Sequence, residues 1–328
     1  MNLHQNNEIF KDLIDLTAEK FSIPSLFIEK DYWVTYVLYN LYKSDYKDTV
    51  VFKGGTSLSK VYGLIDRFSE DVDLVIFNNG QEITLNQNRK LLSKIPKKIA
   101  LDPLEDLGQE HPDFRDTKGY KKRVYKYPKL DENNNEYGHA RSELILEINF
   151  FVEPFPVLVK PVKTYIHEFL YENKYFDTIK EFSLEPFDIN VLCTSRTFYE
   201  KVLSLYRGAH KSIEVLRNRI RHFYDIYMLV TKDEKIKKEI ADKNAFITNL
   251  SNVIDDEKKH EMFCDIEEFL PLYTSVFSKS ILQLKEELRN VYENNFSSMV
   301  YDKSKMPTFD EVYNNMSSIN DIIKEYKL

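Results

Sequence analysis

The chain has 328 residues, of which 46 are basic and 53 acidic, giving a formal charge of −7. That length suffices for one large or two moderate domains. The negative net charge argues against a surface that binds nucleic acid through basic residues all over it, although local basic patches can still bind phosphate. Two cysteines, Cys193 and Cys264, cannot build a disulfide framework or a cysteine zinc site. The segment MNLHQNNEIF lacks a signal-peptide layout and no apolar run reaches membrane length, so we expect a soluble cytoplasmic protein without a membrane partner.

Two helices are predicted at the start of the chain, over residues 8–21 and 25–43, with Ser25 as the N-cap of the second. The second helix carries the polar pair Lys30 and Asp31 within an otherwise apolar pattern. The pattern leaves open whether this pair lies on a solvated face or belongs to a site.

The most informative stretch is VVFKGGTSLSKVYGLIDRFSEDVDLVIF, at residues 50–77. Asp71 and Asp73 are separated by one residue in a predicted strand, so their side chains point to the same face. Two neighbouring carboxylates repel one another unless a cation lies between them, and Mg²⁺ is commonly held by one or two carboxylates together with substrate phosphates. The pair therefore predicts a site for Mg²⁺, with Mn²⁺ as a possible substitute.

The Gly54-Gly55 turn comes before a predicted helix whose apolar positions run from Leu58 to Ile65. Glycine lets a ligand approach the backbone closely, and exposed N–H groups at a helix start suit phosphate. Arg67 either binds phosphate or pairs with Glu70 or Asp66. The stretch thus predicts a phosphate cradle directly before a metal-binding strand. The predicted nucleotide-binding residues here are Lys53, Gly54, Gly55, Thr56, Ser57, Arg67 and Ser69.

Farther along, residues 86–101 read as a helix with a lysine-rich outer side, and residues 120–127 and 141–152 read as a strand hairpin. In the second strand, period two places Glu147 and Glu143 on the face opposite Leu144, Leu146 and Ile148. Glu147, at mid-strand, is the preferred third carboxylate, and Glu143 is its competitor. The alternative is that both glutamates lie on an ordinary solvent-exposed face of the strand and have no role in a site.

The first strand of that hairpin is basic, with tyrosines between the charges. The basic side chains of such a strand can bind the phosphates of a nucleic acid, and its aromatic rings can stack on bases. It can equally be an edge strand whose lysines prevent aggregation. The candidate nucleic-acid-binding residues are Lys121, Lys122, Arg123 and Lys126.

From about residue 186 the pattern becomes helical, with helices predicted over 190–209 and 213–231 and further ones to 325. We therefore expect an α+β protein: a domain at 1–185 with a mixed sheet and flanking helices, and a helical bundle at 186–328. Within the bundle, Lys201 can neutralise phosphate charge or pair with its neighbour Glu200. Asp225, amid apolar residues, either pairs with a base such as Arg221 or belongs to a site.

The stretch FKGGTSLSKVYGLIDRFSEDVDLVI resembles the signature of the AbiEii-type, MenT-like nucleotidyltransferase toxins, within the polymerase β-like superfamily. EKDYWVT at 29–35 and the segment from Glu200-Lys201 to RHFYDIY at 221–227 fit the same pattern. The resemblance implies a polymerase β-like fold, with Asp71, Asp73 and Glu147 as catalytic metal ligands. It also implies that Lys201 and Asp225 contribute to the catalytic cleft from the helical domain, and that Lys30 and Asp31 lie near the nucleotide.

These residues predict metal-dependent transfer of a nucleoside monophosphate from an NTP to an acceptor hydroxyl. The resemblance implies that the acceptor is RNA, in particular the 3′ end of tRNA, and that a cognate antitoxin exists in a phage-defence system. Nucleotidylation of a small molecule or a protein is the enzymatic alternative, and a non-catalytic nucleotide-binding module is the other. A Walker motif is excluded because Ser59 stands where it needs glycine, and the histidines lack zinc spacing.

Overall fold

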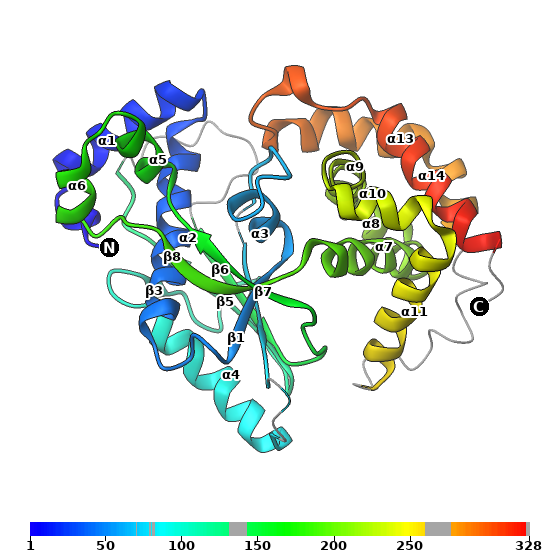
Figure 1. Cartoon of the computed structure of the whole chain (residues 1–328), viewed down its shortest axis with the longest axis horizontal. Coiled ribbons are helices and arrows are strands. Elements are labelled where there is room, and N and C mark those ends of the chain that lie inside the picture. Colours follow the sequence, from blue (N-terminus) through cyan, green and yellow to red (C-terminus); the bar gives the residue numbers. More distant parts are fainter. Residues whose placement is uncertain (70, 79, 81–82, 131–142, 260–276, 326–328) are drawn as a thin grey trace. The chain divides into compact units, whose positions relative to one another are not determined.

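The computed structural model describes residues 1–69, 71–78, 80, 83–130, 143–259 and 277–325. Within them the chain forms two compact units, one of residues 1–63 and 67–192, the other of residues 64–66 and 193–328. The first combines a mixed sheet with flanking helices and the second is helical (Figure 1), which confirms the predicted α+β class.

The first unit contains, in chain order, η1 (Leu3–Gln5), α1 (Asn7–Phe21), α2 (Ser25–Lys43), β1 (Val50–Lys53), α3 (Gly54–Lys60), β2 (Asp71–Ile76), α4 (Leu85–Ile99), β3 (Glu105–Asp106), β4 (Arg115–Asp116), β5 (Tyr120–Lys126), β6 (Glu143–Asn149), β7 (Val157–Val162), α5 (Tyr165–Glu172), α6 (Phe176–Glu181) and β8 (Phe187–Leu192). Among the described residues the sheet has eight strands in the order β3-β5-β6-β2-β1-β8-β7, with β4 also paired to β5. The pairs β2–β6 and β1–β8 are parallel and the others are antiparallel, so the sheet is mixed.

The centre of the sheet is apolar because its strands are covered. Phe52, Leu74 and Leu146 are fully buried, and α2 and α4 pack against one another and against strands of the sheet. Trp33 of α2 is fully buried and stacks on Tyr127 after β5. The buried, largely apolar side of α2 therefore packs against the sheet from which the candidate site is built.

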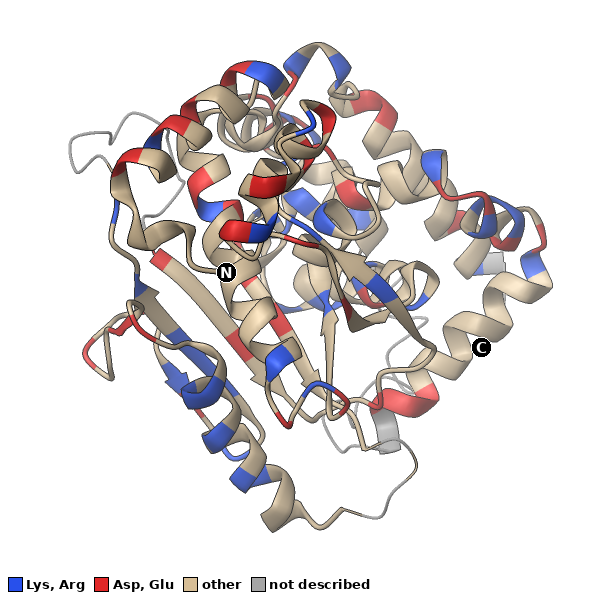
Figure 2. Cartoon of the chain, turned by 60° about the vertical axis from the view of Figure 1, so that its left-hand side comes forward, with Lys and Arg blue, Asp and Glu red and all other residues tan. Residues whose placement is uncertain are grey.

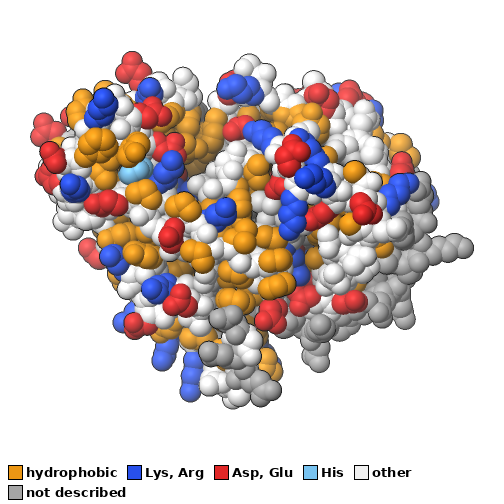
Figure 3. Space-filling model, in the orientation of Figure 1, with side chains coloured by type: hydrophobic (Ala, Val, Ile, Leu, Met, Phe, Trp, Pro, Cys, Tyr) orange, Lys and Arg blue, Asp and Glu red, His pale blue; other side chains and the backbone are white. Residues whose placement is uncertain are grey.

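At one edge of the sheet, β7 exposes Val159, with 65% of its surface accessible, and Leu158, with 40%. Figure 3 shows hydrophobic side chains on the surface over the region of β7. Lys160 and Pro161 lie in the same strand, and both residue types disfavour pairing with a further strand.

The second unit contains α7 (Thr194–Lys211), α8 (Ile213–Arg217), α9 (Ile220–Lys232), α10 (Glu234–Ala241), α11 (Lys243–Lys259), α13 (Lys285–Asn290), the π-helix η2 (Val291–Asn295), η3 (Phe296–Met299), η4 (Lys303–Lys305) and α14 (Phe309–Glu325). Ion pairs join α7 to α11: Arg196 to Asp256 at 2.6 Å and Arg207 to Glu257 at 2.5 Å. Burial raises the pKa of Glu257 despite the opposing charge of Arg207.

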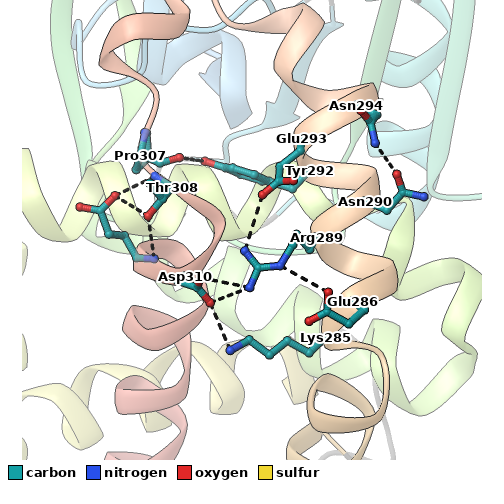
Figure 4. A network of polar contacts seen from close by, with 11 residues as sticks. Lys285, Glu286, Arg289, Asn290, Tyr292, Glu293, Asn294, Pro307, Thr308 and Asp310 are labelled. Atoms are coloured by element: carbon teal, nitrogen blue, oxygen red, sulfur yellow. Dashed lines mark hydrogen bonds and ion pairs between the residues drawn. The ribbon is translucent and has the colours of Figure 1, made fainter.

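Near the end of the chain, Arg289 of α13 donates from Nη2 to both carboxylate oxygens of Asp310, at 2.9 and 3.0 Å (Figure 4). Its guanidinium also lies 5.0 Å from the ring centroid of Phe309, and the Tyr292 hydroxyl donates to the Pro307 carbonyl oxygen at 2.8 Å. These contacts fasten α14 to the preceding helical segments.

Four local predictions were wrong. The helix expected over 190–209 begins only at Thr194, because Phe187–Leu192 forms the strand β8 between β1 and β7. A short apolar run with β-branched residues does not distinguish a strand from a helix start. The helix expected over 213–231 is divided into α8 and α9, and Ser25 is the first residue of α2 while Pro24 is its N-cap.

The helix after the glycine pair is also shorter than predicted, since α3 ends at Lys60 and Gly63 has a φ of +61°. Residues 64–66 belong to the second unit, where the Asp66 carboxylate pairs with Lys232 at 2.7 Å and the Asp66 N–H donates to the Tyr224 hydroxyl at 3.2 Å. Ile65 therefore does not continue the apolar face of α3. The predicted turn between β5 and β6 and part of the helical region predicted after residue 231 lie outside the described residues.

Candidate active site

Two neighbouring strands bring the three predicted carboxylates to one face of the sheet. In the parallel pair β2–β6, Asp73 lies opposite Glu147 and Asp71 lies opposite Ile145. Adjacent strands are about 4.8 Å apart and side chains alternate between faces, so Asp71, Asp73 and Glu147 project from the same side. All three are partly exposed, while Val72, Leu74 and Ile148 on the other side are buried.

Tyr120 of β5 shares this space and was not among the predicted site residues. Burial raises the pKa of Tyr120 far above its usual value, and the nearby charges of Glu147, Asp73 and Asp71 raise it further. Its neutral hydroxyl donates a hydrogen bond to Glu147. The signal in the sequence was period two, because Tyr120 lies two residues before Lys122, the residue directly opposite Glu147.

The glycine turn lies against the second aspartate. Gly54 has a φ of +80°, and a Cβ there would lie 2.0 Å from Oδ2 of Asp73. A Cβ on Gly55 would lie 2.6 Å from Nη2 of Arg67 and 3.0 Å from the Ser69 hydroxyl oxygen. Gly54 is therefore required by its backbone conformation as well as by space, while a side chain at Gly55 would displace the Arg67 guanidinium. The turn brings bare backbone to within contact distance of the Asp73 carboxylate.

Hydrogen bonds of side-chain hydroxyl groups connect this turn to the start of β2. Thr56 Oγ1 donates to the Asp71 carbonyl oxygen at 2.5 Å and lies 2.9 Å from the Ser69 hydroxyl. Ser57 donates to the Gly54 carbonyl oxygen at 2.9 Å. Lys53, at the end of β1, lies opposite Asp73 in the antiparallel register. The predicted cradle residues and the aspartate strand thus form one connected group.

Arg67 and Lys30 are buried cations near this group. Arg67 is 1% exposed and donates from Nη1 to the Phe68 carbonyl oxygen at 2.9 Å. Lys30 is fully buried, with its ammonium 5.2 Å from the ring centroid of Phe68. Phe27 stacks on the same ring at 4.1 Å between centroids. Their burial requires polar or aromatic partners, and a nucleotide-binding role stays a prediction.

Asp31, the other predicted residue of α2, has two structural contacts. Its Oδ1 pairs with the Lys60 ammonium at 2.5 Å, and its Oδ2 accepts from the Tyr165 N–H at 3.0 Å. These contacts join α2 to the end of α3 and to the start of α5. They give the carboxylate a packing role in addition to the predicted role near the nucleotide.

The basic strand β5 is not an open edge, since the short strands β3 and β4 pair along its other side. Lys121 and Arg123 both bind Asp116, at 2.6 and 2.7 Å, and Lys122 pairs with Glu147 at 3.3 Å. Although burial acts in the opposite direction, hydrogen bonds from Lys121 and Arg123 lower the pKa of Asp116. Lys126 is exposed. Three of the four predicted nucleic-acid-binding residues therefore have carboxylate partners within the chain.

The donor chemistry at the aspartate strand suits a hard cation, since carboxylate oxygens are the ligands that Mg²⁺ prefers. Among the described residues, however, no three His, Cys, Asp or Glu side chains are gathered closely enough to hold a metal ion by themselves. Glu147 is directed to Lys122. The arrangement therefore fits a metal held by Asp71 and Asp73 together with substrate phosphates better than a preformed three-carboxylate cage.

In the second unit, Lys201 of α7 and Asp225 of α9 form an ion pair of 2.7 Å between Nζ and Oδ2. The Lys201 side chain is 9% exposed and the Asp225 side chain is fully buried. His222 lies one turn before Asp225, with Nδ1 4.0 Å from Oδ2. Glu200 instead pairs with Arg196 at 3.2 Å. The aspartate thus holds the lysine at a fixed position in its own unit.

A strand with two aspartates beside a glycine turn is typical of a nucleotidyltransferase. The family described as the nucleotidyl transferase AbiEii toxin of type IV toxin–antitoxin systems matches residues 36–315, and the chain belongs to this family. The family implies a nucleotide substrate and a cognate antitoxin. No curated protein matches the chain. Among the described residues, no helix is long and apolar enough to cross a membrane.

Among solved structures, the chain is similar to MenT4, a nucleotidyltransferase toxin from Mycobacterium tuberculosis H37Rv. The two sequences are 17% identical, the TM-score is 0.37, and the match covers 67% of this chain and 72% of that one.

Replacing Gly54 by alanine tests the contact with Asp73. We expect Gly54→Ala to lose about 1–2 kcal/mol of unfolding free energy through its left-handed backbone, and to lower nucleotidyltransferase activity by about 100-fold because Asp73 must move. Gly108→Ala is the control: its φ is +71° but no atom lies within 4 Å of the added Cβ. Urea unfolding should show a loss of stability in both variants, larger in Gly54→Ala because its Cβ also meets Asp73, and transfer assays should show a loss of activity in Gly54→Ala alone. Equal activity in the two variants would contradict the contact.

The buried pair in the second unit predicts strong coupling. Lys201→Met or Asp225→Asn should each cost about 3–5 kcal/mol, because each leaves a buried charge without its partner. The double variant should cost much less than the sum, as measured by urea unfolding. The exposed pair of Lys237 and Glu234, with side chains 41% and 74% exposed, is the control and should show coupling below about 1 kcal/mol. Additive losses at Lys201 and Asp225 would mean that the pair contributes no coupling.

Proposed function

We propose that the chain transfers a nucleoside monophosphate from an NTP to an acceptor hydroxyl of RNA, in a reaction that depends on Mg²⁺ or Mn²⁺. The observation that carries this proposal is the register of β2 against β6. It sets Asp73 beside Glu147, while the absence of a side chain at Gly54 lets the glycine turn lie against the Asp73 carboxylate.

In this proposal Asp71 and Asp73 hold the metal, and the backbone at Gly54 and Gly55 receives the triphosphate. A bound divalent cation would neutralise phosphate charge and favour ionisation of the acceptor hydroxyl. The acceptor oxygen forms a bond to the α-phosphorus, the bond from that phosphorus to the bridging oxygen breaks, and pyrophosphate leaves with the electron pair. Glu147 takes up the proton of the acceptor hydroxyl at a carboxylate oxygen.

The neighbours of Glu147 support this role. Lys122 lies 3.3 Å from one of its oxygens, and the Tyr120 hydroxyl donates to the same carboxylate. Both contacts hold the carboxylate in position beside Asp73, where it can face an acceptor hydroxyl. Contributions of Lys201 and Asp225 to the reaction stay a prediction from the family resemblance.

RNA as acceptor, in particular the 3′ end of tRNA, and action in phage defence by growth arrest follow from the family resemblance. Modification of a small molecule or a protein is the alternative within the same chemistry. Charge reversal at Lys121, Lys122 and Arg123 is a poor test of the two, because these residues hold Asp116 and Glu147. Their reversal would disturb the sheet and the site together.

The transfer reaction is tested by incubating the protein with each α-labelled NTP, total RNA and Mg²⁺ or Mn²⁺. Asp73→Asn should lower label transfer at least about 100-fold, because it removes a metal ligand. Glu105→Gln, which changes an exposed carboxylate of the same sheet, should leave transfer unchanged. A wild type that transfers no label to RNA with any of the four nucleotides would overturn RNA as acceptor. An Asp73→Asn variant as active as the wild type would overturn the assigned site.

A further inference from the structure

The helix α4 has a charge composition unlike the rest of the chain. Between Leu85 and Ile99 it has no acidic residue, while the whole chain has more acidic than basic side chains. Figure 2 shows the basic residues along this helix with no acidic residue among them. The basic residues of α4 are Arg89, Lys90, Lys94, Lys97 and Lys98.

All five of these side chains are exposed, and among the described residues no carboxylate forms an ion pair with any of them. The basic residues of β5 differ in this respect, because Lys121 and Arg123 bind Asp116 and Lys122 binds Glu147. Surface lysines are usually interspersed with acids, which lowers the local potential. The charge of α4 is thus available to an external anion and that of β5 is largely neutralised.

The positions of the charges define a stripe along the helix. Lys90, Lys94 and Lys97 are separated by four and three residues, so they share one face, with Arg89 and Lys98 on either side. At 1.5 Å per residue the five span about 14 Å of helix axis. Each strand of a nucleic-acid duplex carries one phosphate charge per about 3.4 Å, so such a length corresponds to about four phosphates along one strand. The stripe therefore matches an extended polyanion better than a single phosphate group.

The opposite face of α4 decides between nucleic acid and an anionic membrane. Leu92, Ile95 and Ile99 are at most 1% exposed, and α4 packs against β2, β5 and β6. A helix that lies in a membrane surface inserts its apolar face among the lipids. The apolar face of α4 is buried in the core of the protein. Only the basic face of the helix is therefore exposed for binding.

We propose that the outer face of α4 binds the sugar–phosphate backbone of RNA. The choice of RNA rests on the proposed function, in which RNA is the acceptor, and the surface gives that acceptor a second contact apart from the aspartate strand. Binding through the backbone is independent of sequence and strongly dependent on salt.

The experiment measures binding of fluorescein-labelled bulk tRNA by anisotropy over a series of salt concentrations, without NTP. The test variant is Lys90→Gln/Lys94→Gln/Lys97→Gln. Its affinity should fall at least about tenfold at low salt, and the slope of log K against log salt should become shallower by about 2–3, since each lost phosphate contact contributes about 0.7–0.9. Glutamine has nearly the helix propensity of lysine, and circular dichroism checks that α4 still folds.

The matched control is Lys235→Gln/Lys237→Gln/Lys238→Gln on α10, which removes the same charge from exposed positions where Glu239 and Glu234 lie nearby. It should bind tRNA with an affinity within about twofold of the wild type. An equal loss in both variants, or no loss in the α4 variant, would overturn the proposal. Binding to phosphatidylglycerol vesicles that is lost in the α4 variant while tRNA binding persists would also overturn it, in favour of a membrane.

Asp73→Asn separates this proposal from the proposed reaction. It should bind labelled tRNA as tightly as the wild type while it fails to transfer label from an NTP. If the wild type transfers no nucleotide but the α4 variant still loses tRNA binding, the reaction is wrong and the RNA surface stands. If transfer to RNA is normal in the α4 variant at all RNA concentrations and its tRNA affinity is unchanged, the surface is wrong and the reaction stands.

Discussion

The parallel pairing of β2 with β6 is the contact on which the candidate site depends. It sets Asp73 directly beside Glu147, although the two residues are far apart in the chain and are separated by α4 and three strands. A slip of one residue would turn one of the two carboxylates to the apolar face of the sheet. Burial of Leu74, Leu146 and Ile148 on that face opposes such a slip, because it would expose them and bury acids instead. The hydrophobic core therefore determines where the acidic residues lie.

Bringing acids together has an electrostatic cost, and the neighbouring strand reduces it. Lys122 pairs with Glu147, and Tyr120 donates to the same carboxylate. Asp73 lies against the bare backbone of Gly54, where any side chain would displace it. The acids are thus held by contacts on both sides. This combination explains why the same few residues can be both structurally required and chemically useful.

The basic residues of β5 and those of α4 have different roles, which the amino-acid composition of the two segments does not distinguish. The charges of β5 bind Asp116 and Glu147 and so stabilise the sheet and the candidate site. Those of α4 point to solvent with no acidic partner among the described residues, while the apolar side of the helix lies in the core. The tyrosine-rich basic strand resembled a nucleic-acid-binding segment in the sequence, yet the lysine-rich helix, which looked ordinary, has the free charge. The difference arises because β4 supplies Asp116 to β5, a pairing between short strands that no local pattern predicts.

The sequence by itself determined the mixed α+β class, the strand with Asp71 and Asp73, the glycine turn before it and the alternation that puts Glu143 and Glu147 on one face. These features depend on local rules, namely side-chain period and the conformational freedom of glycine, and so they can be read from neighbouring residues. It could not determine that Phe187–Leu192 joins the sheet as β8, that α3 ends at Lys60, or that Tyr120 lies against Glu147, because each depends on partners that are distant in the chain. Only the tertiary structure decided which charges are neutralised, since an ion pair forms where folding brings two side chains within a few ångströms, and sequence separation gives no measure of that distance.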